Sequence, residues 1–259
     1  MSERELRLAD ERDIPTLKSL WAAAFPDEDA TDIDAFFDRF FNMCAVPLVC
    51  ENGTAVSMLF LIPQRLRCPS TVVSTAYIYA GATRTDRRGR GLYRLLLTYA
   101  EQVARKNGVQ ALFLRPASAR LEESYRRMGF TVSMCCDCAD VQRDGDITFL
   151  EMSAAAYAER RRFLLDRLSV PYVDWDEAVI AHAQRWCRAV SCGEGACALV
   201  ARDNSCIWEY LSTDATVRWP FAVRACRFPG SSTTIGLLKP LDDMDALKSS
   251  PLYMGYGLE

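Results

Sequence analysis

The alternation of apolar and polar residues predicts helices and strands in mixed order over the first half of the chain. Apolar Leu17, Leu20 and Trp21 recur at the spacing of one helix face, and Thr31 is expected to cap the helix that follows. Glu51-Asn52-Gly53 marks a hairpin turn between two strands. The expected elements are a strand at 6–8, helices at 10–24 and 31–43, strands at 45–50, 54–67 and 71–83, a helix at 92–106, a strand at 109–115, a helix opened by Ser118, and a strand ending near 139.

A polar, turn-like stretch at residues 140–146 is the best boundary between domains, which predicts one domain over 1–142 and another over 147–259. The second half repeats a helix-plus-hairpin order, so a smaller C-terminal α+β lobe is expected. Its elements are a helix at 153–168 with Arg160–Arg162 on the solvated face, a helix at 174–188, and strands at 196–201 and 206–211. The apolar ending at 252–258 predicts a docked strand rather than a frayed tail.

The segment Arg88-Gly89-Arg90-Gly91-Leu92-Tyr93 joins the expected strand at 71–83 to the expected helix at 92–106. Two glycines at such a turn let the backbone bend sharply and approach a ligand closely. The first turn of the helix then offers unpaired N–H groups and the positive end of its dipole. Further arginines at 84, 87 and 94 add positive charge. The sequence therefore predicts a site for phosphate or pyrophosphate at this turn.

The residues of this turn exclude two common phosphate-binding loops. The nucleotide-triphosphate loop requires Gly-x4-Gly-Lys-Ser/Thr, and the chain has no such string. The dinucleotide fingerprint Gly-x-Gly-x-x-Gly fits only in part, because Arg94 stands where the third glycine belongs. Its ribose-binding acid is also missing, since the strand at 111–114 is apolar and ends at Arg115.

Arg88, Gly91 and Tyr93 occupy the three fixed positions of Arg-x-x-Gly-x-[Gly/Ala], although Tyr93 replaces the usual small residue. The strand before the turn, the helix and strand after it, and Tyr125-Arg-Arg-Met-Gly129-Phe130 follow in matching order and spacing. In these features the chain resembles the Gcn5-related N-acetyltransferases (GNAT), particularly the enhanced-intracellular-survival branch, over roughly residues 3–140. The resemblance implies an α/β fold with a mixed, splayed central sheet flanked by helices. It also suggests that the C-terminal lobe is a degenerate second GNAT-like unit.

The resemblance implies that acetyl-CoA is the cosubstrate. Its pyrophosphate would lie on residues 88–93, which are Arg88, Gly89, Arg90, Gly91, Leu92 and Tyr93. Backbone groups of Gly81, Ala82 and Thr83 would bind the pantetheine arm, with one N–H facing the thioester oxygen; Gly81 suits close backbone approach, or an ordinary bulge. Ser118 is an N-cap or a cofactor contact. Tyr77 and Tyr79 line a pocket or pack within the sheet.

The departing thiolate needs a proton, and a phenol of pKa about 10 can supply it at neutral pH. In the family the tyrosine four residues before Gly-Phe has this role, which implies Tyr125; the alternative is an aromatic residue of the core. The general base is not readable from the sequence. One candidate is the acidic loop Asp27-Glu28-Asp29, and the alternative for this loop is that it is only a solvated surface loop. The other is the chain end at Glu259, which the resemblance implies lies beside the acceptor pocket.

Composition narrows the classes of function. The net charge of −3 gives no support to nucleic-acid binding. No apolar stretch is long enough to cross a bilayer, and the charged N-terminus lacks the apolar core of a signal peptide. These last two features predict a cytoplasmic protein. The 11 cysteines are odd in number and indicate thiols rather than disulfides. Cys135-Cys136-Asp137-Cys138 has too few partners for zinc, with His182 the single histidine, so no metal is expected.

The leading hypothesis is an acetyl-CoA-dependent N-acetyltransferase that modifies a primary amine of a small molecule or peptide. A non-catalytic acyl-CoA-binding regulatory module is the alternative, and Tyr125 favours the enzyme because a binding module needs no phenol there. Transfer from aminoacyl-tRNA would favour a basic track across both lobes, whereas the chain is net acidic. The identity of the amine and the oligomeric state stay open.

Overall fold

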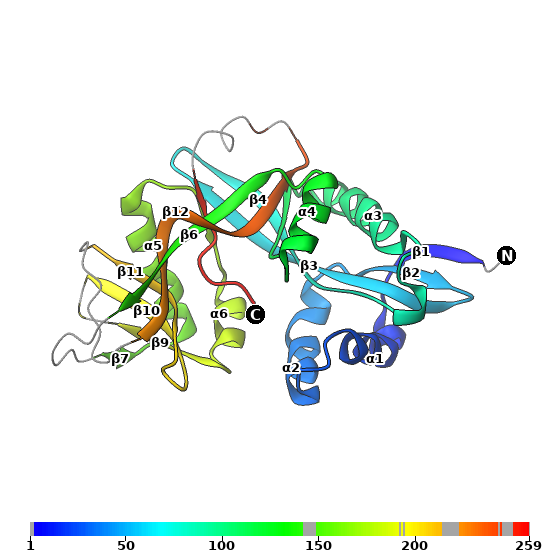
Figure 1. The fold of residues 1–259 in the computed structure, drawn as a ribbon, viewed down its shortest axis with the longest axis horizontal. Helices are drawn as coiled ribbons and strands as arrows, with labels where there is room; N and C mark the ends of the chain where they lie inside the picture. The colour runs from blue at the N-terminus through cyan, green and yellow to red at the C-terminus, as the bar shows by residue number, and fades with distance from the viewer. Residues whose placement is uncertain are drawn as a thin grey trace. The chain divides into compact units, whose positions relative to one another are not determined.

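The computed structural model describes residues 3–141, 149–191, 193, 195–213, 223–242, 244 and 251–258 (Figure 1). Contacts divide the chain into two compact units. Unit 1 comprises residues 1–63, 74–114 and 239–242, and unit 2 comprises residues 64–73, 115–238 and 243–259. No helix within the described ranges is long and apolar enough to cross a membrane.

Unit 1 is a mixed sheet with helices on both faces. Its strands, in spatial order, are β1 (Arg4–Leu8), β2 (Pro47–Glu51), β3 (Thr54–Cys68), β4 (Thr71–Thr83) and β5 (Ala111–Leu114). The β1–β2–β3 pairs are antiparallel, whereas β4 and β5 are parallel. Figure 1 shows α1 (Ile14–Ala24) and α2 (Ala30–Phe40) on one side of the sheet and α3 (Leu92–Lys106) on the other.

Aromatic rings fill the core between α1, α2 and the sheet. Trp21 on α1 is buried and packs against Phe36 of α2 at 4.8 Å between ring centroids, and against Phe60 of β3 at 5.8 Å. It also meets Tyr79 of β4 edge-on at 5.7 Å. This packing follows from the apolar stripe that the sequence places on both helices, and it fixes α1 and α2 against β3 and β4.

The cap of α2 differs from the prediction. Asp29, not Thr31, is the N-cap, because its side chain accepts a hydrogen bond from the backbone N–H of Thr31 at 2.7 Å. The helix ends at Phe40, and a short 3-10 turn continues to Met43. Aspartate and threonine are both good caps, and the two-residue offset reflects where the acidic loop ends.

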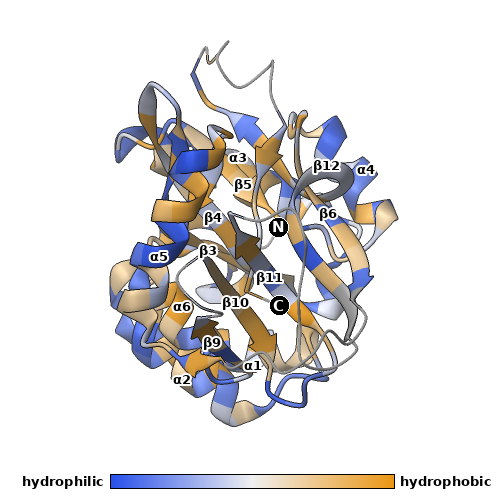
Figure 2. Cartoon of the chain, turned by 90° about the vertical axis from the view of Figure 1, so that its left-hand side faces the viewer, coloured by the Kyte–Doolittle hydropathy of each residue, from blue (hydrophilic) through white to orange (hydrophobic). Residues whose placement is uncertain are grey.

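Unit 2 contains the remaining helices and a second set of strands. These elements are α4 (Ala119–Arg127), β6 (Val132–Val141), β7 (Leu150–Glu151), α5 (Ala154–Leu168), β8 (Tyr172–Asp174), α6 (Glu177–Ala183), β9 (Cys187–Ser191), β10 (Ala196–Ala201), β11 (Ile207–Ser212), β12 (Val223–Pro240) and β13 (Leu252–Tyr253). The strand order is β8-β13-β6-β12-β11-β10-β9-β7. Strand β10 is hydrophobic along its length and buried throughout (Figure 2).

Two predictions for unit 2 were wrong. The segment expected to be one helix at 174–188 divides into the end of β8, α6 and the start of β9, because β9 pairs with β10 and with β7. Arg161, expected on a solvated helix face, is buried with 1% of its surface exposed. Its guanidinium meets the Glu209 carboxylate at 2.7 Å, and the Tyr157 hydroxyl donates to the same carboxylate at 2.9 Å.

The docked C-terminal strand is confirmed. In β13, Tyr253 pairs with Cys135 of β6 and Tyr172 of β8, and residues 252–258 are all buried. The Trp175 indole donates to the carbonyl of Met254 at 2.9 Å. Glu259 lies outside the described residues, so its predicted role is not placed.

Candidate functional site

The turn between β4 and α3 has the backbone that its two glycines predict. Gly89 and Gly91 have φ angles of +76° and +73°, in the left-handed region that favours glycine. Helix α3 begins at Leu92 without a side-chain cap, and its first backbone bond joins the N–H of Leu95 to the carbonyl of Gly91 at 3.1 Å. The amides of the first helical turn therefore have no acceptor within the helix and point toward the turn.

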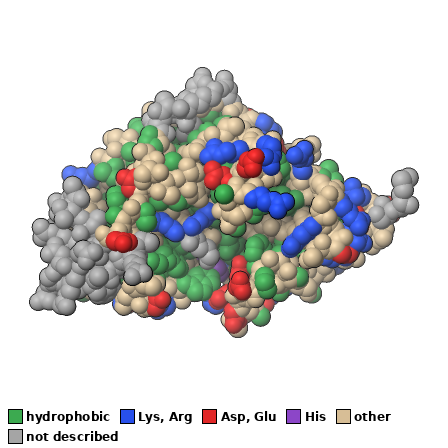
Figure 3. Space-filling model, viewed as in Figure 1, with side chains coloured by type: hydrophobic (Ala, Val, Ile, Leu, Met, Phe, Trp, Pro, Cys, Tyr) green, Lys and Arg blue, Asp and Glu red, His purple; other side chains and the backbone are tan. Residues whose placement is uncertain are grey.

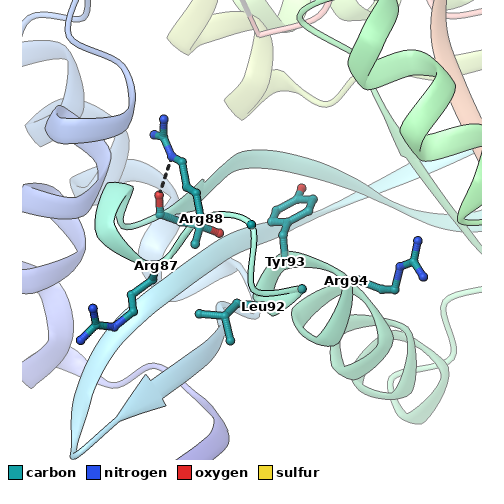
Figure 4. Close-up of a pocket in the computed structure, with 8 residues that line it drawn as sticks. Arg87, Arg88, Leu92, Tyr93 and Arg94 are labelled. Atoms are coloured by element: carbon teal, nitrogen blue, oxygen red, sulfur yellow. Dashed lines mark hydrogen bonds between the residues drawn. The ribbon is translucent and has the colours of Figure 1, made fainter.

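A pocket of about 250 Å³ lies at this turn. Its lining residues are Thr83, Arg87, Arg88, Gly89, Gly91, Leu92, Tyr93 and Arg94. Figure 4 shows the side chains of Arg87, Tyr93 and Arg94 leaving the turn in different directions, with Arg88 turned back toward β4. The structure thus brings together five of the six residues predicted to hold the pyrophosphate, and the sixth, Arg90, lies between two of them.

The arginines of the turn fall into two groups. Arg84 pairs with Asp86 at 2.7 Å, and Arg87 pairs with Glu51 at 2.8 Å, so both have a carboxylate partner. The side chains of Arg90 and Arg94 are exposed, and neither guanidinium makes a hydrogen bond or ion pair with any residue that the structure describes. Basic side chains (blue in Figure 3) gather on the side of the molecule where Figure 1 labels α3. Arg88 is also exposed without a carboxylate partner among the described residues, so the positive charge left for a ligand belongs to Arg88, Arg90 and Arg94.

The carboxylates beside the turn fix its shape. Hydrogen bonds from Arg87 and then Arg4 lower the pKa of Glu51, whose side chain is buried. The hydrogen bond from Arg84 likewise lowers the pKa of Asp86. Arg88 contributes differently, because its Nε donates to the carbonyl of Thr83 at 3.1 Å, the dashed line in Figure 4. These bonds fasten the turn to the ends of β2 and β4.

The end of β4 has one bonded edge and one open edge. The Arg84 N–H donates to Val56 of β3 at 2.9 Å, and Ser57 of β3 donates to the carbonyl of Ala82 at 2.9 Å. Backbone groups of successive residues point to opposite edges of a strand, so those of Gly81 and Thr83 point away from β3. On that side the recorded pairing with β5 ends at Tyr77 and Phe113, while β4 continues to Thr83. Strand β4 thus continues beyond the end of β5 at Leu114.

Ala80 is a feature that the sequence did not signal. Its φ angle is +48°, in the left-handed region, within strand β4 and directly before Gly81. Such a conformation costs an ordinary residue roughly 1–2 kcal/mol and is common at functional sites. Gly81 itself has no positive φ angle, so its role is spatial: the ring of Tyr93 lies against it.

The acidic loop between α1 and α2 is anchored through one carboxylate. Glu28 accepts a hydrogen bond from the buried indole of Trp21 at 2.6 Å. Desolvation raises the pKa of Glu28, against the lowering effect of this bond, and the charge of Asp32 raises it further. Desolvation, and then the negative charge of Glu28, raise the pKa of the Tyr79 hydroxyl well above its ordinary value. Asp27, Glu28 and Asp29 are all exposed, and Asp29 is occupied as the cap of α2.

Comparison with known proteins identifies this arrangement. Residues 5–133 match the family model of the acetyltransferase (GNAT) domain. The chain contains a GNAT acetyltransferase domain. The predictions of the family, of its α/β fold and of an acyltransferase are therefore confirmed. Among curated proteins, no match was found.

Solved GNAT structures share the fold of nearly the whole chain. A GCN5-related N-acetyltransferase from Kribbella flavida superposes with a TM-score of 0.72 at 14% identity, covering 93% of this chain and 72% of that one. A GCN5-related N-acetyltransferase from Anabaena variabilis gives 0.72 at 12% identity, covering 93% and 73%. Eis1 from Mycobacterium abscessus gives 0.64 at 13% identity, covering 93% and 74%. The likeness extends well beyond the 5–133 match and includes the C-terminal part of the chain.

The other predicted residues of the GNAT site lie in unit 2. Tyr125 is half-buried on α4 and meets Phe130 edge-on at 5.7 Å. Ser118 caps α4, accepting from the N–H of Leu121 at 3.3 Å, as predicted. The family match crosses from unit 1 into unit 2, so units defined by contact need not coincide with sequence domains. The domain division at 142–147, like the catalytic role of Tyr125, stays a prediction.

The remaining candidates lie within secondary structure. Tyr77 is buried and stacks on Phe113 at 5.0 Å, so it packs within the sheet, whereas Tyr79 is only half-buried. His182 is buried against Trp186. The cysteine cluster lies along β6, and its three thiols are free. Within the described ranges no group of three or more His, Cys, Asp or Glu residues could hold a metal ion.

Proposed function

We propose that the chain is an acetyl-CoA-dependent N-acetyltransferase that modifies a primary amine of a small molecule or peptide by direct attack, with Tyr125 as general acid. The observation that carries this proposal is the juxtaposition, within unit 1, of an uncapped helix start and the open edge of β4. The first suits a pyrophosphate, and the second suits the amides of a pantetheine arm. A CoA thioester has both groups joined in one molecule.

The residues of the turn fit the phosphates of CoA. Backbone N–H groups of residues 89–93 would face the pyrophosphate, where the left-handed glycines leave no Cβ in the way. Arg90 and Arg94 would neutralise phosphate charge, since neither has a carboxylate partner among the described residues. The backbone groups of Gly81 and Thr83 on the open edge would pair with the pantetheine arm, with Ala82 bonded to β3 between them.

Acetyl transfer then needs a nucleophile and a proton donor. The amine nitrogen attacks the thioester carbonyl carbon, and the C–S bond breaks as the thiolate takes a proton from a phenol. The amine gives one proton to solvent, and solvent returns one to the phenolate. Tyr125 is the phenol at the family's position for this donor. A phenol is protonated at neutral pH and can donate to a thiolate as it forms.

On the acceptor side, Glu28 is the best-placed carboxylate of the acidic loop. The Trp21 indole holds it by a hydrogen bond, and the charge of Glu28 acts on the Tyr79 hydroxyl in unit 1. A carboxylate held at the surface attracts a cationic amine. We expect Glu28→Gln to raise KM for the amine at least about threefold, as the loss of a modest charge contact would, and to leave the acetyl-CoA dissociation constant unchanged. Asp27→Asn is the matched control.

The side-chain carboxylate of Glu259 is the other candidate for the acceptor side. Deleting Leu258 and Glu259 should raise KM for the amine or lower turnover while leaving acetyl-CoA affinity intact. If neither kinetic constant changes, the chain end has no part in the reaction.

The central test of the function measures thiol release from acetyl-CoA across polyamines, aminoglycosides and peptides. With a true acceptor, Tyr125→Phe should lower turnover by roughly 10²–10⁴ and retain cofactor binding, as loss of a general acid does. Unchanged turnover would make Tyr125 a packing residue. If the wild type binds acetyl-CoA but none of the tested amines causes thiol release, the chain is an acyl-CoA-binding module instead.

A further inference from the structure

The aromatic residue at the last motif position reaches across to the strand expected to hold the thioester. A Cβ built on Gly81 would lie 2.4 Å from the Tyr93 hydroxyl oxygen, 2.9 Å from Cε2 and 3.0 Å from Cζ. Of the Tyr93 atoms, the hydroxyl at the tip of the side chain therefore lies nearest to this Cβ position. Tyr93 starts at the second residue of α3 and bridges the turn and the strand within unit 1.

Gly81 and Tyr93 are therefore coupled in space. Any side chain at position 81 would meet the phenol, because contacts below 3.0 Å force one of the groups to move. Gly81 also follows Ala80, whose left-handed φ angle of +48° sets the direction of the strand at this point. Its backbone groups point to the open edge of β4. The Tyr93 hydroxyl is thus held beside the backbone position proposed for the thioester.

We propose that the Tyr93 hydroxyl is a second hydrogen-bond donor to the thioester carbonyl oxygen, alongside a backbone N–H of β4. This inference rests on the proposed function, because it takes the thioester to lie at Gly81. Attack by the amine converts the carbonyl into a tetrahedral intermediate whose oxygen carries the negative charge. Two fixed donors stabilise that oxyanion until the C–S bond breaks and the carbonyl reforms. The phenol keeps its own proton throughout, which separates this role from that of Tyr125.

Ring packing alone would make a different prediction. A packing residue fills space through its ring, and phenylalanine fills that space nearly as well as tyrosine. An oxyanion donor acts through its O–H, which phenylalanine lacks. Tyr93→Phe therefore separates the two roles, and Tyr99→Phe, a half-buried tyrosine on the same helix, is the matched control.

We expect Tyr93→Phe to lower kcat by about 10²-fold, the lower end for loss of one oxyanion donor. The acetyl-CoA dissociation constant should stay within about twofold of the wild-type value, since the donor acts mainly after attack. Tyr99→Phe should leave both constants unchanged. A wild-type kcat in Tyr93→Phe would overturn the inference without affecting the proposed function. Absence of acetyl-CoA turnover in the wild type would instead reject the proposed function, and this inference with it.

A second variant tests the geometry. Gly81→Ala places a methyl carbon 2.4 Å from the Tyr93 hydroxyl oxygen, closer than the two atoms can pack, so it should displace the phenol and lower kcat. If the phenol mediates that loss, Gly81→Ala should lower kcat by a clearly smaller factor in the Tyr93→Phe background than in the wild type. The effects of two substitutions in one interaction are not additive. Full additivity of the two losses would overturn the coupling. Circular dichroism and urea unfolding establish that each variant is folded.

Discussion

Arginines serve opposite purposes in the two units. In unit 2, Arg161 is buried, with its guanidinium bonded to the Glu209 carboxylate and to the carbonyl of Val173. In unit 1, the side chains of Arg90 and Arg94 are exposed beside the turn, and their guanidinium groups bond to no described residue. The same side chain is a satisfied part of the core in one unit and an available anion contact in the other.

The difference shows that the number of arginines near a motif does not measure its capacity to bind phosphate. Two of the arginines around the turn, Arg84 and Arg87, are bonded to carboxylates and hold the loop in place. What matters is which guanidinium groups have no carboxylate partner. On that basis the charges for CoA are those of Arg88, Arg90 and Arg94, and Arg88 is also bonded to the strand through Nε.

The largest expected effect lies in the buried pair. Arg161→Met should lower the free energy of unfolding by about 3–5 kcal/mol, because it leaves the Glu209 carboxylate buried without its cation. Urea denaturation measures this loss. Replacing both partners, as Arg161→Met with Glu209→Leu, should lower the free energy of unfolding by less than Arg161→Met alone does. A loss below about 1 kcal/mol for Arg161→Met would remove the distinction between the two classes of arginine.

A smaller effect is expected from the exposed arginines. Arg90→Ala with Arg94→Ala should weaken acetyl-CoA binding about tenfold, or about 1.4 kcal/mol, and leave the unfolding free energy unchanged. The salt dependence of binding should also become shallower, since fewer charges meet the phosphates. Arg84→Ala, whose guanidinium already pairs with Asp86, is the control and should change affinity less than twofold. Equal losses in both variants would show that pairing does not decide availability.

The smallest effect is a pH dependence at Glu51. Arg87 and Arg4 lower its pKa, so the folded protein holds the ionised form more strongly than the unfolded chain does. The resulting stability is present above the ordinary pKa of about 4.5 and is lost as the pH falls through the lower folded value. Urea unfolding should show that the free energy of unfolding falls less steeply between pH 6 and pH 3 in Glu51→Gln than in the wild type. Identical pH profiles would mean that the Arg87 pair does not stabilise the turn.

Periodicity and turn chemistry predicted most of unit 1. The helix at Leu92–Lys106, the strand at Thr71–Thr83 and the left-handed glycines follow from patterns confined to neighbouring residues. The cap of Ser118 and the docked C-terminal strand were also predictable, because each has a local signature.

Features that depend on distant residues were not predictable. Three consecutive arginines indicate a solvated face, and only Glu209, far away in the sequence, makes burial of Arg161 favourable. The segment 174–188 has helical spacing, but pairing of β9 with β10 and β7 prevails over it. Alanine gives no signal of a left-handed angle, and the bond between Trp21 and Glu28 joins a helix face to a loop whose path the sequence does not fix.

Calorimetric titration with acetyl-CoA tests the central claim most directly. Gly91→Asp places a Cβ and a carboxylate where the pyrophosphate must meet the backbone. The control is Gly108→Asp at the other end of α3, because Gly108 has a φ angle of +72° and Gly91 one of +73°, so both variants impose the same left-handed strain. The account predicts that the wild type and Gly108→Asp bind acetyl-CoA alike, and that folded Gly91→Asp binds at least about tenfold more weakly, about 1.4 kcal/mol. Unchanged affinity in a folded Gly91→Asp protein would contradict the assignment of this turn as the CoA site.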